Sequence, residues 1–509
     1  MAAAESLAET FRMEGTCGEE LQSGRFHGKL HCCSASATAH PFRFCLHCFF
    51  IVFHSVFVCI SGSSSSSLVL QTQATRQVLL TFSPLSLSLH TFETMAGTYQ
   101  LQRGLRNILQ KQPNDIVFLS ALRTPVTRAK KGGFKDAYDH ELLAHVLKAT
   151  LAANPNLDPA KIQDIMIGNV LSELGGSKAG RMAAAHVGYP ETTAFQTVNR
   201  ACSSGLAAIT GIAHAIAVGS IDVGVGGGME SMTRNYGSRA IPTQLWEELK
   251  NSPVKEARDC IMSMGITAEN VAERYRVSRA DQDAFAAASH QKAAKAQKDG
   301  LYDKEIVPVT TRWHPNPENP EVTEEITVDK DDGIRPNSTL ESLAKMKPAF
   351  KPDGCSTAGN SSQVSDGAAA ALMMRRSTAT ALGLEKDIIG KWAGTQTIGC
   401  KPDEMGIGPA IAIPKLLDYT GVSTNEVGIW EINEAFASQA IHCVRTLGID
   451  EAKVNPKGGA IALGHPLGAT GARQLATLLP ELERQGQQVG VISMCIGTGM
   501  GMASLIVRE

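Results

Sequence analysis

The chain has few aromatic residues and almost no net charge. Aromatic side chains make up 5% of its 509 residues, and the formal net charge is −2. A balance so near zero excludes a role driven by bulk charge, such as nonspecific binding to nucleic acid or to a membrane surface. Glycine, in contrast, is abundant, with 47 residues. Many glycines and few aromatics favour a densely packed α/β fold with tight strand-to-helix turns.

The chain also lacks the cysteine pattern of a disulfide framework. Half of its 12 cysteines precede Met95, and the others are widely scattered, at Cys202, Cys260, Cys355, Cys400, Cys443 and Cys495. Scattered cysteines in a long chain indicate a reducing compartment. Cys45 and Cys48 have the spacing of a zinc half-site, but no second ligand pair at zinc-finger spacing follows them, and we expect no metal.

Residues 1–94 show no motif and no periodic core element. Their apolar stretch Phe44–Ile60 is interrupted by His47 and His54 and is short for a transmembrane helix. It also lies too far into the chain, without a small-residue cleavage site, for a signal peptide. We interpret 1–94 as a disordered leader or as sequence upstream of the true start, with Met95 as the initiator. A membrane anchor is the alternative.

Cys202 lies in a turn built from small residues, Asn199–Gly205. The turn follows a predicted strand, Thr193–Val198, and precedes a predicted helix that runs from Gly205 to about Val218. A position near the positive end of a helix lowers the pKa of a thiol and directs backbone N–H groups at a developing anion. A free cysteine is more often a small buried apolar residue, but Cys-Ser-Ser-Gly before an amphipathic helix favours a nucleophile elbow.

His465 and Cys495 occur in similar surroundings. His465 stands among glycines and a proline that fix a tight backbone, before a predicted helix at Ala472–Leu482. Cys495 follows the predicted strand Val489–Met494 and precedes a glycine-rich turn. That turn lacks the helix and the acidic residue of a dinucleotide site, which excludes a Rossmann interpretation. The Cys495 thiol suits a proton shuttle, since its reference pKa is nearer neutrality than that of a hydroxyl.

A fourth segment follows the predicted strand Val427–Ile432. Asn433 can hold a water molecule and Glu434 can buffer a site, although both residues could instead cap a helix that starts at Ala435. Two thiols and one imidazole are the parts required for acyl transfer through a thioester.

The units that carry Cys202 and His465 form an internal repeat. Each has a Val-Asn pair, a reactive loop, a helix, a strand and a glycine-rich end. Ligands bind beyond the carboxyl ends of strands in such sheets, so the repeat predicts that both loops reach the same face.

These motifs together resemble the thiolase family. Cys-Ser-Ser-Gly, the segment Gly359–Gly367, Asn-Glu-Ala-Phe, Gly-His-Pro-Leu-Gly and Cys-Ile-Gly-Thr-Gly-Met-Gly occur in the family's order, and the resemblance runs from about Asn114 to Arg508. The Ser-Ser-Gln-Val-Ser-Asp-Gly run at Ser361–Gly367 is most similar to the peroxisomal 3-ketoacyl-CoA subgroup.

The resemblance implies a five-layered αβαβα fold made of two related halves. Residues 114–384 would form the first half, with an inserted loop domain at about 235–360 that covers coenzyme A, and residues 385–509 the second. Most of the basic residues from Arg274 to Lys295 are interpreted as a solvated helix face.

The resemblance also implies residue roles. Cys202 would be the acylated nucleophile, and His465 would activate it and form an oxyanion hole with a water held by Asn433. Cys495 would take and give the substrate proton. Backbone N–H groups of Cys202 and Gly497 would form a second oxyanion hole.

Ser362 would contact coenzyme A near its pantetheine arm. The implied reaction is thiolytic cleavage of a 3-ketoacyl-CoA to acetyl-CoA and a shortened acyl-CoA, with coenzyme A as a substrate and no permanently bound cofactor. The same residues in reverse would make acetoacetyl-CoA, and a lipid carrier without catalysis is a further alternative.

The implied assembly is a homodimer formed through the strand before Cys202, or a pair of such dimers. The implied compartment is the peroxisome. Mitochondria are the alternative, because Tyr99–Lys111 is basic, lacks acidic residues and has an apolar stripe.

Overall fold

A computed structural model describes residues 51–53, 56–58, 101–316, 319 and 321–509. The predictions of a leader at 1–94, of a start at Met95 and of no zinc at Cys45 and Cys48 therefore fall outside the described residues. Two short antiparallel strands are the part of that region that is described, β1 (Ile51–Phe53) and β2 (Val56–Val58).

The globular part is organised around a mixed sheet of 10 strands. In spatial order its strands are β12 (Ile429–Ile432), β13 (Val489–Ile496), β14 (Met500–Arg508), β11 (Gly390–Gly399), β3 (Ile116–Arg123), β10 (Ser365–Arg375), β7 (Val223–Ser231), β5 (Asp164–Gly168) and β6 (Ala194–Val198), with β4 (Thr127–Arg128) beside β10. A short antiparallel pairing of β11 with β3 joins the strands of the two halves.

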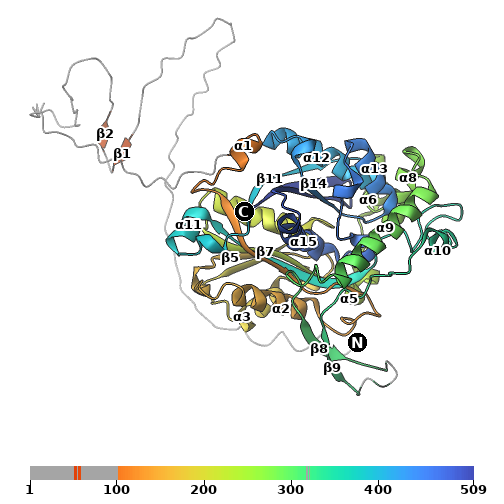
Figure 1. The fold of residues 1–509 in the computed structure, drawn as a ribbon, viewed down its shortest axis with the longest axis horizontal. Coiled ribbons are helices and arrows are strands. Elements are labelled where there is room, and N and C mark those ends of the chain that lie inside the picture. The colour runs from red at the N-terminus through yellow and green to blue at the C-terminus, as the bar shows by residue number, and fades with distance from the viewer. Residues whose placement is uncertain (1–50, 54–55, 59–100, 317–318, 320) are drawn as a thin grey trace, which may run out of the picture. The chain divides into compact units, whose positions relative to one another are not determined.

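Helices cover both faces of each half and fill the space between the halves. The outer helices are α2 (Asp139–Ala152) and α3 (Ser177–His186) on one side and α12 (Gly408–Thr420) and α13 (Ala437–Leu447) on the other, and the central ones are α4 (Ser204–Ala217) and α15 (Thr470–Arg484). Figure 1 shows α15 between the strands of the two halves, with α12 and α13 above and α2 and α3 below. The predicted αβαβα order of layers is confirmed.

Three apolar cores correspond to this stacking. One lies between α2, α3 and the strands of the first half, and another lies between α12 and the strands of the second half. The middle core surrounds the central helices, where Ile209 and Ile212 of α4 pack with Leu475 and Leu478 of α15. Apolar residues at helical spacing therefore identified both central helices, and the observed ends lie within two residues of the predicted ones.

The segment between β7 and β10 forms the largest excursion from the sheet. It contains α5 (Met232–Arg239), α6 (Glu247–Lys250), α7 (Lys255–Asp259), α8 (Met264–Arg274), α9 (Arg279–Lys298), α10 (Leu340–Ala344) and the hairpin of β8 (Val309–Trp313) with β9 (Glu324–Val328). Shorter helices elsewhere are α1 (Leu105–Ile108), α11 (Arg376–Ala381), α14 (Ala460–Leu463) and the 3-10 turn η7 (Leu467–Ala469).

A fully buried ionic cluster ties this excursion to both halves. Arg123 of β3 pairs with Glu305 at 2.7 Å and with Asp331 at 2.8 Å. Lys457 of the second half pairs with the same Glu305 at 2.6 Å. Since each buried charge has an opposite charge in direct contact, the cluster fixes the excursion against the sheet without leaving an unpaired ion.

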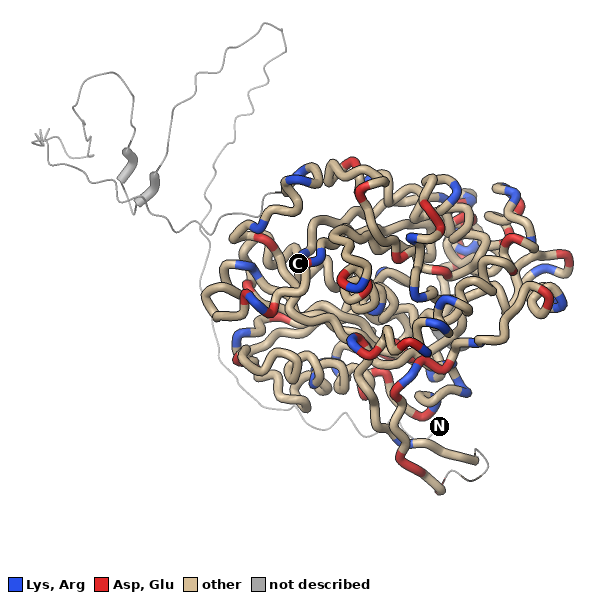
Figure 2. The backbone as a smooth tube through the Cα atoms, viewed as in Figure 1, with Lys and Arg blue, Asp and Glu red and all other residues tan. Residues whose placement is uncertain are grey.

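The surface carries mixed charge. Figure 2 shows Lys and Arg interspersed with Asp and Glu over the globular part, as the near-zero net charge predicts. Within the described ranges, none of the helices has the combination of length and apolar character needed to cross a membrane.

Candidate active site

Cys202 sits in a strained turn between β6 and α4. Its neighbour Ala201 has φ 44°, a left-handed conformation that is unusual for a residue with a side chain. The Ser204 hydroxyl closes the turn, because it accepts from Arg200 N–H at 2.9 Å and donates to Ala201 O at 2.7 Å. The geometry is that of the predicted nucleophile elbow, and Cys202 itself is 2% exposed.

Glycines allow the Cys202 helix and the His465 loop to touch through their backbones. A Cβ atom on Gly228 would lie 2.0 Å from the carbonyl oxygen of Gly468, and one on Gly205 would lie 2.7 Å from the same oxygen. Neither distance leaves room for a side chain. The glycine-rich sequence of both loops therefore has a packing reason, and the predicted meeting of the two reactive loops is what the structure contains.

His465 is held by both of its ring nitrogens. Its Nδ1 lies 2.6 Å from the Thr470 hydroxyl, which in turn donates to Pro466 O at 3.2 Å. Because that hydroxyl's proton is committed to Pro466, Nδ1 carries the ring proton, and the unprotonated Nε2 faces Asn433 Nδ2 at 3.4 Å. Burial, with a contribution from Arg473, lowers the pKa of His465 to about 3. The ring is a neutral imidazole whose Nε2 can accept a proton.

Asn433 retains acceptor capacity on its side chain. Its Oδ1 is buried, and among the described residues no side chain or backbone group donates to it. A buried amide oxygen in this position is a good partner for an ordered water. This is compatible with the predicted role of Asn433 as the residue that holds a water beside His465.

Cys495 lies at the end of β13 and is fully buried. Its thiol donates to Gln439 Oε1 at 3.1 Å, and Gln439 Nε2 donates to the backbone oxygen of Asn433 at 3.3 Å. Burial, and then the proximity of Cys202, raise the pKa of Cys495 well above its usual value. Cys495 therefore stays protonated in the resting site, and Gln439 links it to the Asn433 segment.

The electrostatics of Cys202 differ from the sequence prediction. Backbone N–H groups of Gly497 and of Cys202 itself contact its sulfur and favour the thiolate, as expected near a helix end. Burial is the larger effect, however, and the pKa of Cys202 is raised to about 11. The predicted lowering of this pKa is wrong, because burial cannot be judged from a residue's position at a helix end.

Cys202 opens onto an apolar cavity of about 190 Å³. Its walls include the side chains of Leu171, Ile241, Met264 and Leu467, and Gly497 and Thr498 close it on the side of the second thiol. An apolar space next to a nucleophile is suited to an alkyl chain.

Ser362 is joined to the Asn433 segment rather than to the cavity. Its backbone N–H donates to Ala435 O at 2.9 Å, and Ala437 N–H donates back to Asn360 O at 2.9 Å. This pairing places the Gly359–Gly367 motif directly beside the motif that contains Asn433.

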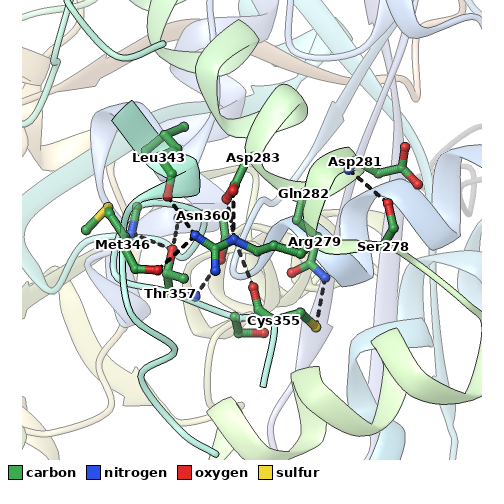
Figure 3. A network of polar contacts seen from close by, with 12 residues as sticks. Ser278, Arg279, Asp281, Gln282, Asp283, Leu343, Met346, Cys355, Thr357 and Asn360 are labelled. Atoms are coloured by element: carbon green, nitrogen blue, oxygen red, sulfur yellow. Dashed lines mark hydrogen bonds and ion pairs between the residues drawn. The ribbon is translucent and has the colours of Figure 1, made fainter. Parts of the chain in front are cut away.

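A polar network around Asn360 holds the start of this motif in place (Figure 3). Arg279 donates to the backbone oxygens of Leu343 and Met346 and pairs with Asp283 at 2.7 Å, while Asp283 accepts from Asn360 at 2.9 Å. The interpretation of the basic residues as a solvated helix face is therefore wrong for Arg279, which connects α9 to α10 and to the chain before Ser362.

The buried carboxylate of Glu434 forms hydrogen bonds that connect neighbouring segments of the chain. Its carboxylate accepts from Ser289 at 2.7 Å and from Asn455 at 2.8 Å. Both partners lie outside the group around Cys202, and the buffering role of Glu434 stays a prediction. The capping alternative is wrong, because α13 begins only at Ala437 and has no side-chain cap.

Three residues of this site were missed by sequence reasoning, namely Gln439, Thr470 and Glu230. Thr470 is the first residue of the helix after His465, a position that could have identified it. Gln439 and Glu230 give no comparable signal, since a single polar residue in a helix or at a strand end is commonplace. None of the described residues forms a cluster with the composition of a metal site.

Comparison with known proteins identifies the family. The sequence matches the thiolase N-terminal domain over residues 116–377 and the thiolase C-terminal domain over residues 386–508. The chain belongs to the thiolase family.

Its relatives include peroxisomal members from fungi and animals. It is 51% identical over 407 residues to the peroxisomal 3-ketoacyl-CoA thiolase of Yarrowia lipolytica, covering 80% of this chain and 96% of that protein. It is 52% identical over 397 residues to the human peroxisomal 3-ketoacyl-CoA thiolase, covering 78% and 91%. The crystal structure of the dimeric peroxisomal thiolase of Saccharomyces cerevisiae is 45% identical with a TM-score of 0.72, covering 79% of this chain and 100% of that one.

Proposed function

We propose that this protein is a 3-ketoacyl-CoA thiolase of β-oxidation, which uses coenzyme A to cleave a 3-ketoacyl-CoA into acetyl-CoA and a shortened acyl-CoA. The observation that carries the proposal is one buried site with two protonated thiols, Cys202 and Cys495, and a neutral imidazole, His465. The names of the Yarrowia and human relatives support the substrate class.

Cys202 begins the reaction as a thiol, so a base has to ionise it. His465 Nε2 accepts the thiol proton, and the sulfur attacks the 3-keto carbon of the substrate. The negative charge that develops on the keto oxygen is stabilised by the backbone N–H groups of Cys202 and Gly497, which also contact the Cys202 sulfur.

Cleavage of the carbon–carbon bond leaves an acyl thioester on Cys202 and the enolate of acetyl-CoA. Cys495 protonates this enolate and becomes a thiolate. Its raised pKa suits the acid role, because the proton stays on sulfur until a strongly basic carbon is present. Protonated His465 and the water held on Asn433 stabilise the thioester oxygen of the leaving enolate.

Coenzyme A completes the cycle. Its thiol gives a proton to the Cys495 thiolate, and its sulfur attacks the thioester on Cys202 to release the shortened acyl-CoA. The Cys202 thiolate then recovers its proton from His465. Ser362 lies near the pantetheine arm of coenzyme A in this scheme, and the apolar cavity takes the acyl chain.

The protein acts in the peroxisome, the compartment named for its Yarrowia and human relatives. It works as a homodimer, paired through β6 as the outer strand of its sheet. The peroxisomal thiolase of Saccharomyces cerevisiae is dimeric, which supports this assembly.

The proposal is tested by trapping the acyl enzyme. The protein is incubated with acyl-CoA alone and digested, and mass spectrometry should find the acyl group on the peptide that contains Cys202. Cys202→Ser should fold, remain unacylated and lose thiolysis by a factor on the order of 10,000, because a hydroxyl is a far weaker nucleophile at neutral pH. An acyl group on Cys495 would reverse the assignment, and failure of wild type to cleave acetoacetyl-CoA or a longer 3-ketoacyl-CoA would refute the proposed function.

A further inference from the structure

Glu230, the penultimate residue of β7, is a fully buried carboxylate next to the nucleophile. It accepts three backbone hydrogen bonds, from Val170 N–H at 3.1 Å, Leu171 N–H at 3.2 Å and Gly468 N–H at 3.0 Å. These donors come from two loops that are far apart in sequence. One follows β5, and the other is the 3-10 turn after His465. One carboxylate thus joins three parts of the chain.

The two loops that Glu230 joins form the walls around the Cys202 thiol. The side chains of Leu171 and Leu467 pack against Cys202 in one apolar cluster, and both line the cavity. Gly468, which directly follows Leu467, is held by Glu230 and lies three residues from His465. A shift of this carboxylate would therefore move one wall of the cavity and the loop of the general base together.

Glu230 also contributes to the charge environment of Cys202. The titratable groups that interact with this thiol are Glu230 from β7, Tyr236 from α5 and Cys495 from β13, with Asp259 and Cys260 of the α7 region on the cavity wall. Burial is the main cause of the raised pKa of Cys202, and the negative charge of Glu230 raises that pKa further.

The charge on Glu230 itself changes within an accessible pH range. Burial raises the pKa of Glu230 to about 8, and the charge of nearby Asp139 acts in the same direction, while the three N–H donors favour the carboxylate. Glu230 is therefore mostly neutral at pH 6.5 and mostly charged at pH 9.

We propose that Glu230 is a positioning residue, whose carboxylate sets the loops of Val170–Leu171 and His465 on either side of Cys202. Its charge has a second effect, since a buried negative charge near the thiol disfavours the thiolate. This inference rests on the proposed thiolase function for its effect on turnover. Its effect on the thiol is independent of the reaction.

Glu230→Gln disturbs both effects, because it keeps the size of the side chain, removes the charge and presents an N–H₂ group to backbone N–H donors. We expect kcat for thiolysis to fall by a factor on the order of 100, since a small displacement of aligned groups is enough for that loss. Alkylation of Cys202 by iodoacetamide is followed by mass spectrometry of its peptide. At pH 9 the variant should react at least about threefold faster than wild type, which corresponds to a fall of about half a unit in the pKa of the Cys202 thiol. At pH 6.5, where Glu230 is mostly neutral in wild type, the two rates should be nearly equal.

Two further variants complete the test. Glu230→Asp keeps the charge and shortens the reach, so its kcat should fall while its Cys202 alkylation profile stays that of wild type. Glu269→Gln is the matched control, because Glu269 is also a buried carboxylate that accepts from backbone N–H groups, those of Cys355 and Ser356. It should leave the Cys202 alkylation profile unchanged.

The outcomes are decisive whether or not Glu230→Gln folds. If Glu230→Gln has a reduced kcat but alkylates at the wild-type rate at pH 9, Glu230 has a merely structural role and the proposal is overturned. A normal kcat in Glu230→Asp would overturn it as well. A wild-type protein that does not cleave 3-ketoacyl-CoA would instead refute the thiolase function, while the alkylation of Cys202 would still report on Glu230.

Discussion

At the scale of single residues, the site combines groups that are all uncharged at rest. Cys202 and Cys495 are thiols because burial raises both pKa values, and His465 is neutral because burial lowers its pKa to about 3. Because these three reacting groups rest uncharged, none of them bears the cost of a buried charge until substrate arrives. During the reaction, negative charge on the substrate oxygens then develops next to protonated His465 and the backbone N–H groups that stabilise it.

The role of Cys495 can be isolated from that of Cys202. Cys495→Ala removes the proton carrier but leaves the nucleophile and His465, so acylation by a simple acyl-CoA should persist. Exchange of the acetyl-CoA α-proton with deuterated solvent should slow by about 100- to 10,000-fold, the usual contribution of a general acid–base group. Exchange at the wild-type rate, followed by NMR, would show that another group moves the proton.

At the scale of elements, the meeting of α4 and the His465 loop depends on backbone contact. Gly205 of α4 and Gly228 of the neighbouring strand β7 both approach Gly468 so closely that a single added carbon atom would overlap its carbonyl oxygen. Since both loops carry reactive residues, the same contact that packs the core also sets the distance between nucleophile and base.

Gly228→Ala therefore tests whether this contact is required. Its Cβ would lie 2.0 Å from Gly468 O, and neither backbone can retreat within the packed centre, so we expect a loss of thiolysis of at least about 100-fold and a lower melting temperature. The matched control is Gly399→Ala at the end of β11, where the nearest atom to the added Cβ lies 3.9 Å away. Equal activity of the two variants would contradict the argument.

The sequence predicted the elements of the site better than its electrostatics. Apolar periodicity located α4 and α15, and the small residues around Cys202 and His465 indicated tight turns, which the structure contains. The direction of the Cys202 pKa shift was wrong, because it depends on how completely other segments cover the thiol. Glu230 and Gln439 were missed for the same reason, since their roles arise from contacts with distant segments that no local pattern reveals.

At the scale of the whole molecule, β6 is the outer strand of its half of the sheet. It pairs with β5 on one side, and Ala194 and Gln196 are exposed. An open edge so close to the nucleophile turn is a liability that a two-fold partner would cover, and two-fold dimers are the commonest assemblies of soluble proteins.

The dimer can be tested at one backbone position. Ala194 N–H donates toward β5, so by alternation the N–H of Thr197 points away from it. Thr197→Pro removes an outward donor while sparing the β5 pairing, and it should give a monomer with reduced activity. Light scattering at micromolar concentration measures this, with Gln196→Ala as a control that should remain dimeric. A fully active wild-type monomer would refute the dimer.

The position of β14 has a consequence for how the protein is made. This strand spans Met500–Arg508, yet it lies inside the sheet between β13 and β11, and β11 in turn pairs with β3, the first strand of the sheet in sequence. Until β14 is paired, β13 and β11 each expose an unpaired strand edge, so the sheet that carries Cys495 is incomplete. Thiolysis therefore depends on the completed sheet, because the last strand in sequence lies inside it and borders the strand that carries Cys495.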